Sequence, residues 1–224
     1  MFYEHRFPQP LTPGVLIKRY KRFMADVQLK NGDVVTAHCV NTGSMEGIAL
    51  PGLKVWLSPA DNPNRKLKWN WELVQKDGQL IGANTALPNA AVFQAIQQRL
   101  LPGFKQWTEA RAEVKYNSDS RIDVWLKHPS GIEHFIEIKN CHLSYPDKRA
   151  YFPDTASVRA TKHLRELEKK VREGHKATVI FFVQAPQAES CRPSDVHDPA
   201  FAATAREVWR SGIEFKAILA APSP

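Results

Sequence analysis

The stretch 113–139 constrains the fold most, because it has the pattern of three short strands that carry charged residues at positions where buried strands normally carry none. Successive side chains of a strand point to opposite faces, so the apolar residues of 122–126 are expected on one face and Asp123 on the other. The same rule places Glu137 and Lys139 side by side on the next strand. Two carboxylates and an amine from neighbouring strands form a candidate site for a divalent cation and a phosphate.

Paired oxygen ligands suit Mg²⁺ or Mn²⁺, and a lysine beside them can stabilise the charge that develops on phosphorus oxygens. We therefore predict Asp123, Glu137 and Lys139 as catalytic residues. Glu113, which shares a strand face with Lys115, is a further candidate ligand beside Asp123 and Glu137. The alternative interpretation is a ladder of surface salt bridges, since alternating charges are common on solvent-facing strands.

A helix expected over 158–173 supports the first interpretation. Its apolar residues repeat at helical spacing, and a glycine at position 174 ends it. Arg159 and Lys162 fall on its polar side, whereas His163 falls on the side that faces the sheet. A basic helix beside an acidic pair is more than a solvated surface requires, although a single inward histidine is more often a core residue.

Composition favours a polyanionic partner. The chain of 224 residues has a formal net charge of +8, which is typical of proteins that meet nucleic acid. Its three cysteines are widely spaced, so a disulfide framework is not expected. The longest compact apolar run, 179–183, is far shorter than a membrane span needs, and the first ten residues do not resemble a signal peptide. We expect a cytoplasmic protein without membrane contact.

Two domains are predicted. Residues 1–84 have the pattern of five short strands with glycine and proline turns, which favours an all-β barrel of the oligonucleotide-binding type. Residues 85–224 alternate helices and strands, which indicates an α/β domain. The first strand pattern runs unbroken over 14–29, and 140–155 is expected to be an irregular loop. The main elements expected beyond residue 84 are helices at 88–101, 158–173 and from 199, and strands at 178–183 and 213–219.

Two stretches of the barrel mix cations with aromatic rings, as proteins that bind single strands do. If 18–23 continues a strand, one face offers Tyr20 between two cations for base stacking. The alternative interpretation assigns aromatic residues of these stretches, Phe23 and Trp71, to the barrel core rather than to base stacking. The loop 41–47 is small and polar enough for its amides to approach a phosphate, but is also typical of an ordinary turn. The predicted nucleic-acid-binding residues are Lys18, Arg19, Tyr20, Lys21, Arg22, Arg65, Lys66, Lys68 and Trp69 in the barrel, with Arg159 and Lys162 in the second domain.

Several motifs together resemble the sugar fermentation stimulation protein A family. They are RYKRFMADV at 19–27, NTGSM at 41–45, DN at 61–62, WEL at 71–73, EVKY at 113–116, SRID at 120–123, EIK at 137–139, YFPD at 151–154 and KHL at 162–164. The resemblance implies a bacterial DNA-binding protein linked to sugar (maltose) metabolism, built from an oligonucleotide-binding barrel and a PD-(D/E)xK nuclease-like α/β domain. It matches Asp123, Glu137 and Lys139 to the nuclease motif, with Glu113 as an additional acid. Ile122 replaces the proline that names the motif.

Three functions remain open on the sequence. The first is a DNA-binding regulatory protein that keeps a nuclease-type metal site. The second is an active Mg²⁺- or Mn²⁺-dependent DNA nuclease. The third is a barrel that binds a small ligand such as a sugar phosphate.

Overall fold

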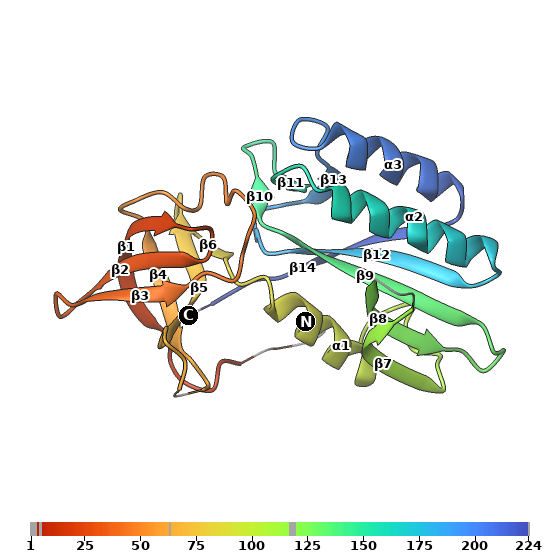
Figure 1. Ribbon diagram of the computed structural model, residues 1–224, viewed down its shortest axis with the longest axis horizontal. Helices are drawn as coiled ribbons and strands as arrows, with labels where there is room; N and C mark the ends of the chain where they lie inside the picture. Colours follow the sequence, from red (N-terminus) through yellow and green to blue (C-terminus); the bar gives the residue numbers. More distant parts are fainter. Residues whose placement is uncertain (1–3, 5, 63, 117–119, 224) are drawn as a thin grey trace.

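The computed structural model describes residues 4, 6–62, 64–116 and 120–223, and the chain builds a barrel followed by an α/β domain (Figure 1). In the barrel, the strands follow the order β3-β2-β1-β4-β5, and a pairing between β3 and β5 closes the sheet, while β6 extends it beyond β5. The predicted fold class is therefore confirmed. The bounds are β1 (Thr12–Tyr20), β2 (Met24–Leu29), β3 (Val34–His38), β4 (Lys54–Pro59), β5 (Trp69–Lys76) and β6 (Gln79–Gly82).

The barrel closes around apolar side chains, which alternate with less buried ones along β2 and part of β1 and are consecutive along β4 and β5. Leu16, Val27 and Leu57 are almost completely buried, as expected for inward positions of period two. Trp71 is also fully buried, so this tryptophan belongs to the core. The expectation for Phe23 was wrong, because its side chain is 49% exposed.

The single strand expected over 14–29 is a hairpin. Lys21 and Arg22 have φ values of 49° and 64°, so the chain reverses there and β2 returns antiparallel to β1. Two successive residues with positive φ match the right-handed twist of the flanking strands. The alternating faces predicted for 18–23 therefore end at Tyr20.

The α/β domain has three layers. Its central sheet has the order β14-β12-β9-β8-β7, with α1 packed against one face and α2 and α3 against the other (Figure 1). Parallel pairing of β12 with both β9 and β14 buries β12 on both faces, which explains its continuous apolar sequence. The bounds are α1 (Leu87–Gln97), β7 (Glu109–Lys115), β8 (Arg121–Lys127), β9 (Glu133–Cys141), α2 (Val158–Arg172), β12 (Lys176–Val183), α3 (Pro199–Arg210) and β14 (Glu214–Leu219).

The loop expected over 140–155 contains two short strands. β10 (Leu143–Ser144) pairs with β11 (Arg149–Phe152), and β11 pairs in parallel with β13 (Ser190–Pro193). These strands are too short to show a period of two in the sequence. They support the segment that leads into α2, where Ser157 caps the helix by accepting a hydrogen bond from the amide of Ala160 at 3.1 Å.

Hydrogen bonds join the barrel to the α/β domain. Asp154 accepts bonds from the amide of Met45 at 2.8 Å and from the hydroxyl of Ser44 at 3.2 Å. Close to that point, the Asp154 carboxylate lies 3.4 Å from His142. The Gly82 amide donates to the carbonyl of Gln184 at 3.2 Å on the other side of the junction. In the described part of the chain, no helix combines the length and apolar character needed to cross a membrane.

Candidate metal and nucleic-acid site

The site forms where the β8–β9 ladder ends. Pairing runs from Lys127↔Glu133 to Val124↔Ile136, so the next opposed residues are Asp123 and Glu137. Instead of continuing the ladder, Asp123 turns its side chain into the gap between the strands. Its Oδ2 accepts a hydrogen bond from the amide of Ile138 at 2.6 Å. The carboxylate therefore replaces a backbone acceptor and is fixed beside Glu137.

The β7–β8 ladder is interrupted at the same level. Its register on both sides places Glu113 opposite Asp123, but no pairing forms there and Glu113 has a φ of 54°. The side chains of β8 change face at Asp123. Ile122 packs in the core between the sheet and α2, whereas Val124 packs in the core between the sheet and α1. The expectation that 122, 124 and 126 share one face was therefore wrong, because strand geometry is regular only on one side of Asp123.

Glu137 is almost completely buried and held by two donors. Its Oε1 accepts from Lys139 Nζ at 2.6 Å and contacts His163 Nδ1 at 2.5 Å. Its Oε2 is buried without a hydrogen-bond partner among the described residues. Burial alone would raise the pKa of this carboxyl, but Lys139 and His163 together hold the pKa below its ordinary value. Glu137 is therefore an anion with one unused oxygen.

Asp123 is in the opposite electrostatic situation. Burial, with a contribution from the neighbouring Glu137 carboxylate, raises the pKa of Asp123 to about 7. Its Oδ1 accepts a hydrogen bond from Asn89 Nδ2 at 2.8 Å, which ties it to α1. Two carboxylates with such different environments are typical of functional sites, because a structural pair would be stabilised rather than left in repulsion.

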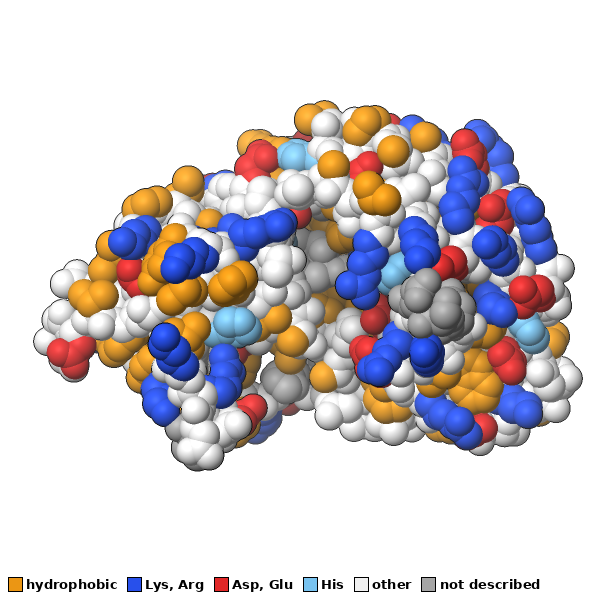
Figure 2. Space-filling view, in the orientation of Figure 1, with side chains coloured by type: hydrophobic (Ala, Val, Ile, Leu, Met, Phe, Trp, Pro, Cys, Tyr) orange, Lys and Arg blue, Asp and Glu red, His pale blue; other side chains and the backbone are white. Residues whose placement is uncertain are grey.

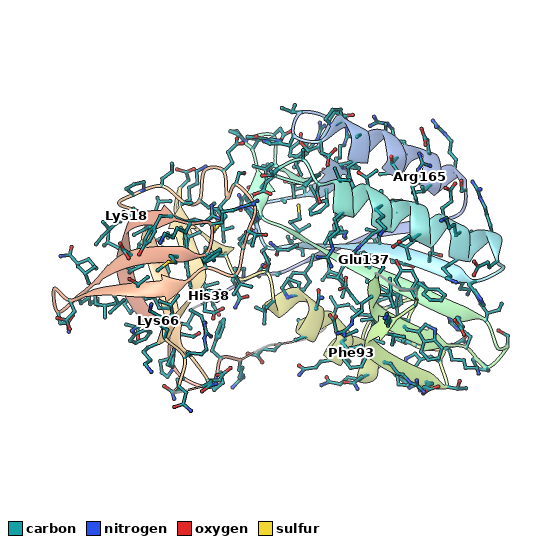
Figure 3. The ribbon with its side chains drawn as sticks, in the orientation of Figure 1. Lys18, His38, Lys66, Phe93, Glu137 and Arg165 are labelled. Carbon is teal, nitrogen blue, oxygen red and sulfur yellow. The ribbon has the colours of Figure 1, made fainter. Side chains whose placement is uncertain are left out.

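A cavity of about 550 Å³ opens over these side chains. Figure 3 shows Glu137 between β9 and α2, and Figure 2 shows Lys and Arg side chains flanking acidic ones beside the hollow between the domains. The cavity is of the size that small-ligand sites have. Its lining includes Glu113, Lys115, Ser120, Arg121, Asp123, Glu137, Lys139, Phe152, Ser157, Arg159 and His163.

Asp123 and Glu137 offer carboxylate oxygens, which are the ligands that hard divalent cations prefer. The orphaned Oε2 of Glu137 lacks a positive partner among the described residues, and a cation beside Asp123 would offset the repulsion that raises the pKa of that carboxyl. The side chains are not arranged as a finished metal cage. Within the described residues, no three His, Cys, Asp or Glu side chains converge as metal ligands. Two protein carboxylates with water completing the shell are what Mg²⁺ commonly uses.

Lys18 and Lys66, two barrel residues of the predicted interface, lie away from this cavity, as their labels in Figure 3 show. Lys18 lies over the ring of Tyr20, with its Nζ 5.3 Å from the centroid, and both side chains contact Asp26. Arg19 is engaged with backbone carbonyls, since its Nη2 donates to Arg22, Asn41 and Gly43 at 2.7 to 2.9 Å. Arg19 therefore has a structural role in this arrangement.

The other basic residues of the predicted barrel interface form two groups at the surface. Lys21 and Arg22 occupy the tip of the β1–β2 hairpin. Lys66 and Lys68 are exposed in the segment before β5, where Arg65 donates to Asn70 at 2.9 Å. Trp69 is only partly buried and packs against the barrel core.

In the α/β domain, Arg159 and Lys162 both lie on the exposed side of α2. Arg159 lines the cavity and its Nε donates to His163 Nε2 at 3.4 Å, whereas Lys162 lies 3.7 Å from Glu166. The structure therefore brings Arg159 to the acidic residues and turns Lys162 towards its own helix.

The central amides of the loop 41–47 donate to protein acceptors. The amide of Met45 donates to Asp154, and that of Ser44 donates to Thr155 Oγ1 at 3.0 Å. The anion that this loop binds is thus a side chain of the other domain.

Sequence reasoning missed Asn89, and left His163 with its more ordinary interpretation as a core residue. For Asn89, whose contact with Asp123 depends on how α1 packs, no local signal exists. For His163 a signal existed, because helical spacing placed it on the inward side of α2. Its contact with Glu137 then follows from α2 crossing β9.

A test of His163 rests on its two nitrogens. Because Nε2 faces the Arg159 donor, we assign the ring proton to Nδ1, which donates to Glu137. Asparagine places its amide near Nδ1 and glutamine places it near Nε2. We expect His163→Gln to lower Mn²⁺ affinity by about tenfold or more, and His163→Asn to lower it much less, since removing such supporting bonds costs about 10- to 100-fold. Titration calorimetry measures both, and equal affinities in the two variants would contradict this role.

Comparisons with known proteins agree with this architecture. Residues 86–224 match the model of the "Sugar fermentation stimulation protein RE domain", and residues 17–83 match that of the "SfsA N-terminal OB domain". A sugar fermentation stimulation protein homolog of Paramagnetospirillum magneticum is 48% identical over 209 residues, covering 93% of this chain and 88% of the relative. One from Maricaulis maris is 44% identical over 219 residues, covering 98% and 93%.

A solved structure gives the same result. SfsA of Pyrococcus furiosus, in complex with Ca²⁺, has a TM-score of 0.86 and 27% sequence identity, covering 94% of this chain and 89% of the other. With both halves of the chain matched and relatives covered over most of their length, this protein belongs to the sugar fermentation stimulation protein family.

Proposed function

We propose that this protein binds DNA and holds a divalent cation, Mg²⁺ or Mn²⁺, at a nuclease-type site in its α/β domain. The observation that carries the proposal is the pair of carboxylates on the cavity floor. Glu137 keeps one buried oxygen without a hydrogen-bond partner among the described residues, and Asp123 has a pKa of about 7 beside it. Residues 85–224 would supply this site, and the barrel of residues 1–84 would supply a second DNA contact.

Asp123 and Glu137 would hold the cation, while Glu113, opposite Asp123 on β7, lines the same cavity and would join them only if its side chain moved towards them. When bound, such a cation activates water and neutralises charge on phosphate oxygens. Lys139 would hold the Glu137 carboxylate in place and face the phosphate across the cavity. The Pyrococcus furiosus relative was solved with Ca²⁺, and we carry a divalent cation over to this chain on that likeness.

Salt dependence tests the DNA contact. If about five phosphates are contacted, the logarithm of the duplex binding constant falls against the logarithm of salt concentration with a slope of about −4 to −5. Fluorescence anisotropy with a labelled duplex measures this slope. Binding that does not respond to salt would contradict the proposal. The association with sugar (maltose) metabolism is part of the proposal through the family alone, and a regulatory role would require this binding.

A second candidate function is metal-dependent hydrolysis of DNA. Lys139 favours it, because a buried ammonium 2.6 Å from Glu137 places a positive charge beside the carboxylates, where a reacting phosphate would gain negative charge. A pure binding site does not need that arrangement. Labelled single- and double-stranded DNA incubated with Mn²⁺ or with chelator distinguishes the two, since only an active nuclease yields metal-dependent products.

A further inference from the structure

Two cations that no sequence motif singled out for binding lie at the mouth of the cavity. Lys115 and Arg121 face each other across the end of the β7–β8 ladder, beyond the interruption at Glu113. Both side chains are exposed, and both line the cavity. Arg159, from the first turn of α2, lines the same cavity. These three residues are called the basic rim below.

Many exposed cations of this domain are paired with acids, whereas Lys115 and Arg121 combine a position in the cavity lining with the lack of an ion pair among the described residues; Lys127 and Arg210 share only the second property. Lys148 is paired with Glu189 at 2.7 Å, and Arg172 is paired with Glu168 at 2.9 Å. In the described part of the chain, Lys115 and Arg121 form no ion pair, although Glu113 lines the same cavity. Cations that converge on a cavity without an acidic partner are suited to an anionic ligand.

The position of the basic rim identifies the anion. The cavity floor is acidic, so a free anion would be repelled by Asp123 and Glu137 unless a cation lay between them. A phosphodiester meets both requirements, because one phosphate can face a cation on the floor while its neighbour along the strand contacts the rim. The cavity of about 550 Å³ has the size of a small-ligand site, which admits part of one strand rather than the body of a duplex.

We infer that the basic rim binds a backbone phosphate of an unpaired DNA strand as that strand enters the cavity. This inference rests on the proposed function and adds to it the residues that hold the strand and the form of DNA that fits. Arginine and lysine both donate hydrogen bonds to phosphate oxygens, so a positive charge at each of the two positions is what the rim requires.

The test compares two double variants that each remove two positive charges. Lys115→Gln with Arg121→Gln removes cations of the rim, and Lys127→Gln with Arg210→Gln removes two exposed cations outside the cavity. Binding of a labelled single strand, with Ca²⁺ present in place of Mn²⁺ so that a cation faces the cavity floor, is expected to weaken by about tenfold or more in the rim variant only. Its salt slope should become shallower by about 0.7 for each phosphate that the variant no longer binds. A hairpin with a long paired stem and a short loop should show a smaller decrease in affinity than the single strand.

Mn²⁺ affinity supplies a readout that structural damage would not reproduce. Removing two cations near the acidic floor should leave Mn²⁺ affinity unchanged or raise it, whereas a disrupted site would bind neither Mn²⁺ nor DNA. If the rim variant melts earlier than the wild type, the swap Lys115→Arg with Arg121→Lys decides, because retained binding of the single strand supports the inference and abolished binding overturns it.

The outcomes separate the two claims. If the wild-type protein binds no oligonucleotide, the proposed function fails. If the wild type binds, and the rim variant binds as tightly as the control variant, only the rim inference is overturned. Equal decreases in affinity for the single strand and the hairpin would overturn the preference for an unpaired strand.

Discussion

Replacing Glu137 by glutamine is expected to abolish the stabilisation of the protein by Mn²⁺ and to lower any metal-dependent cleavage by about 100-fold or more. Glutamine keeps the shape of the side chain but removes the negative charge that Lys139 and His163 support. DNA affinity measured without metal should stay the same or rise, because Glu137 lies on the cavity floor and its negative charge repels phosphate rather than binding it. Thermal melting with and without Mn²⁺, a gel cleavage assay and anisotropy measure the three effects.

Glu133→Gln is a matched control for this experiment. Glu133 lies on the same strand, β9, but contacts Trp125 at 3.0 Å and does not line the cavity. A glutamine there keeps an acceptor for the indole, so Mn²⁺ response and cleavage should match those of the wild type. Retention of the full Mn²⁺ response in Glu137→Gln would contradict the assignment of a metal site.

Replacing Asp123 by asparagine is expected to stabilise the metal-free protein at pH 8 while removing its response to Mn²⁺. The folded-state pKa of Asp123 is raised to about 7 from an ordinary value of 3.8. The favourable contribution of the protonated acid is therefore complete below pH 4 and is lost as the pH rises towards 7. Asparagine carries no charge at any of these pH values, so we expect a gain of about 1 to 2 kcal/mol at pH 8 and little change at pH 4.

Chemical denaturation at the two pH values measures this gain, and Asp61→Asn, an exposed change in the barrel, is the control. In the wild type, Mn²⁺ affinity should also fall as the pH drops below about 7, because protons compete for Asp123. If the difference in unfolding free energy between Asp123→Asn and the wild type is the same at pH 4 and at pH 8, the charge of Asp123 does not destabilise the folded protein.

The local part of the site followed from the sequence. An E-x-K spacing depends only on the period of a strand, and Glu137 and Lys139 are indeed in contact at 2.6 Å. Helical spacing likewise placed His163 inward on α2. The change of face near Asp123 was not foreseen, because it accompanies an interruption of the β7–β8 ladder at which Glu113 has a positive φ, which is uncommon for glutamate.

The barrel shows the same limit for a different reason. Hairpin turns of this geometry are usually marked by Asn-Gly or similar pairs, but the turn after Tyr20 is built from Lys21 and Arg22. Arg19 then looked like a surface cation, although it donates to the carbonyls of Asn41 and Gly43. Interactions between segments distant in the chain decide both cases, and they leave no local pattern.

The hydrogen bonds of Asp154 to Ser44 and Met45, with the bond from Gly82 to Gln184, fix the barrel at a set distance from the cavity. A strand bound at once on the barrel and in the cavity would span that distance with a constant number of nucleotides. The junction would then fix the number of nucleotides between the one bound on the barrel and the one bound in the cavity. That spacing would be a property of the fold rather than of the DNA sequence.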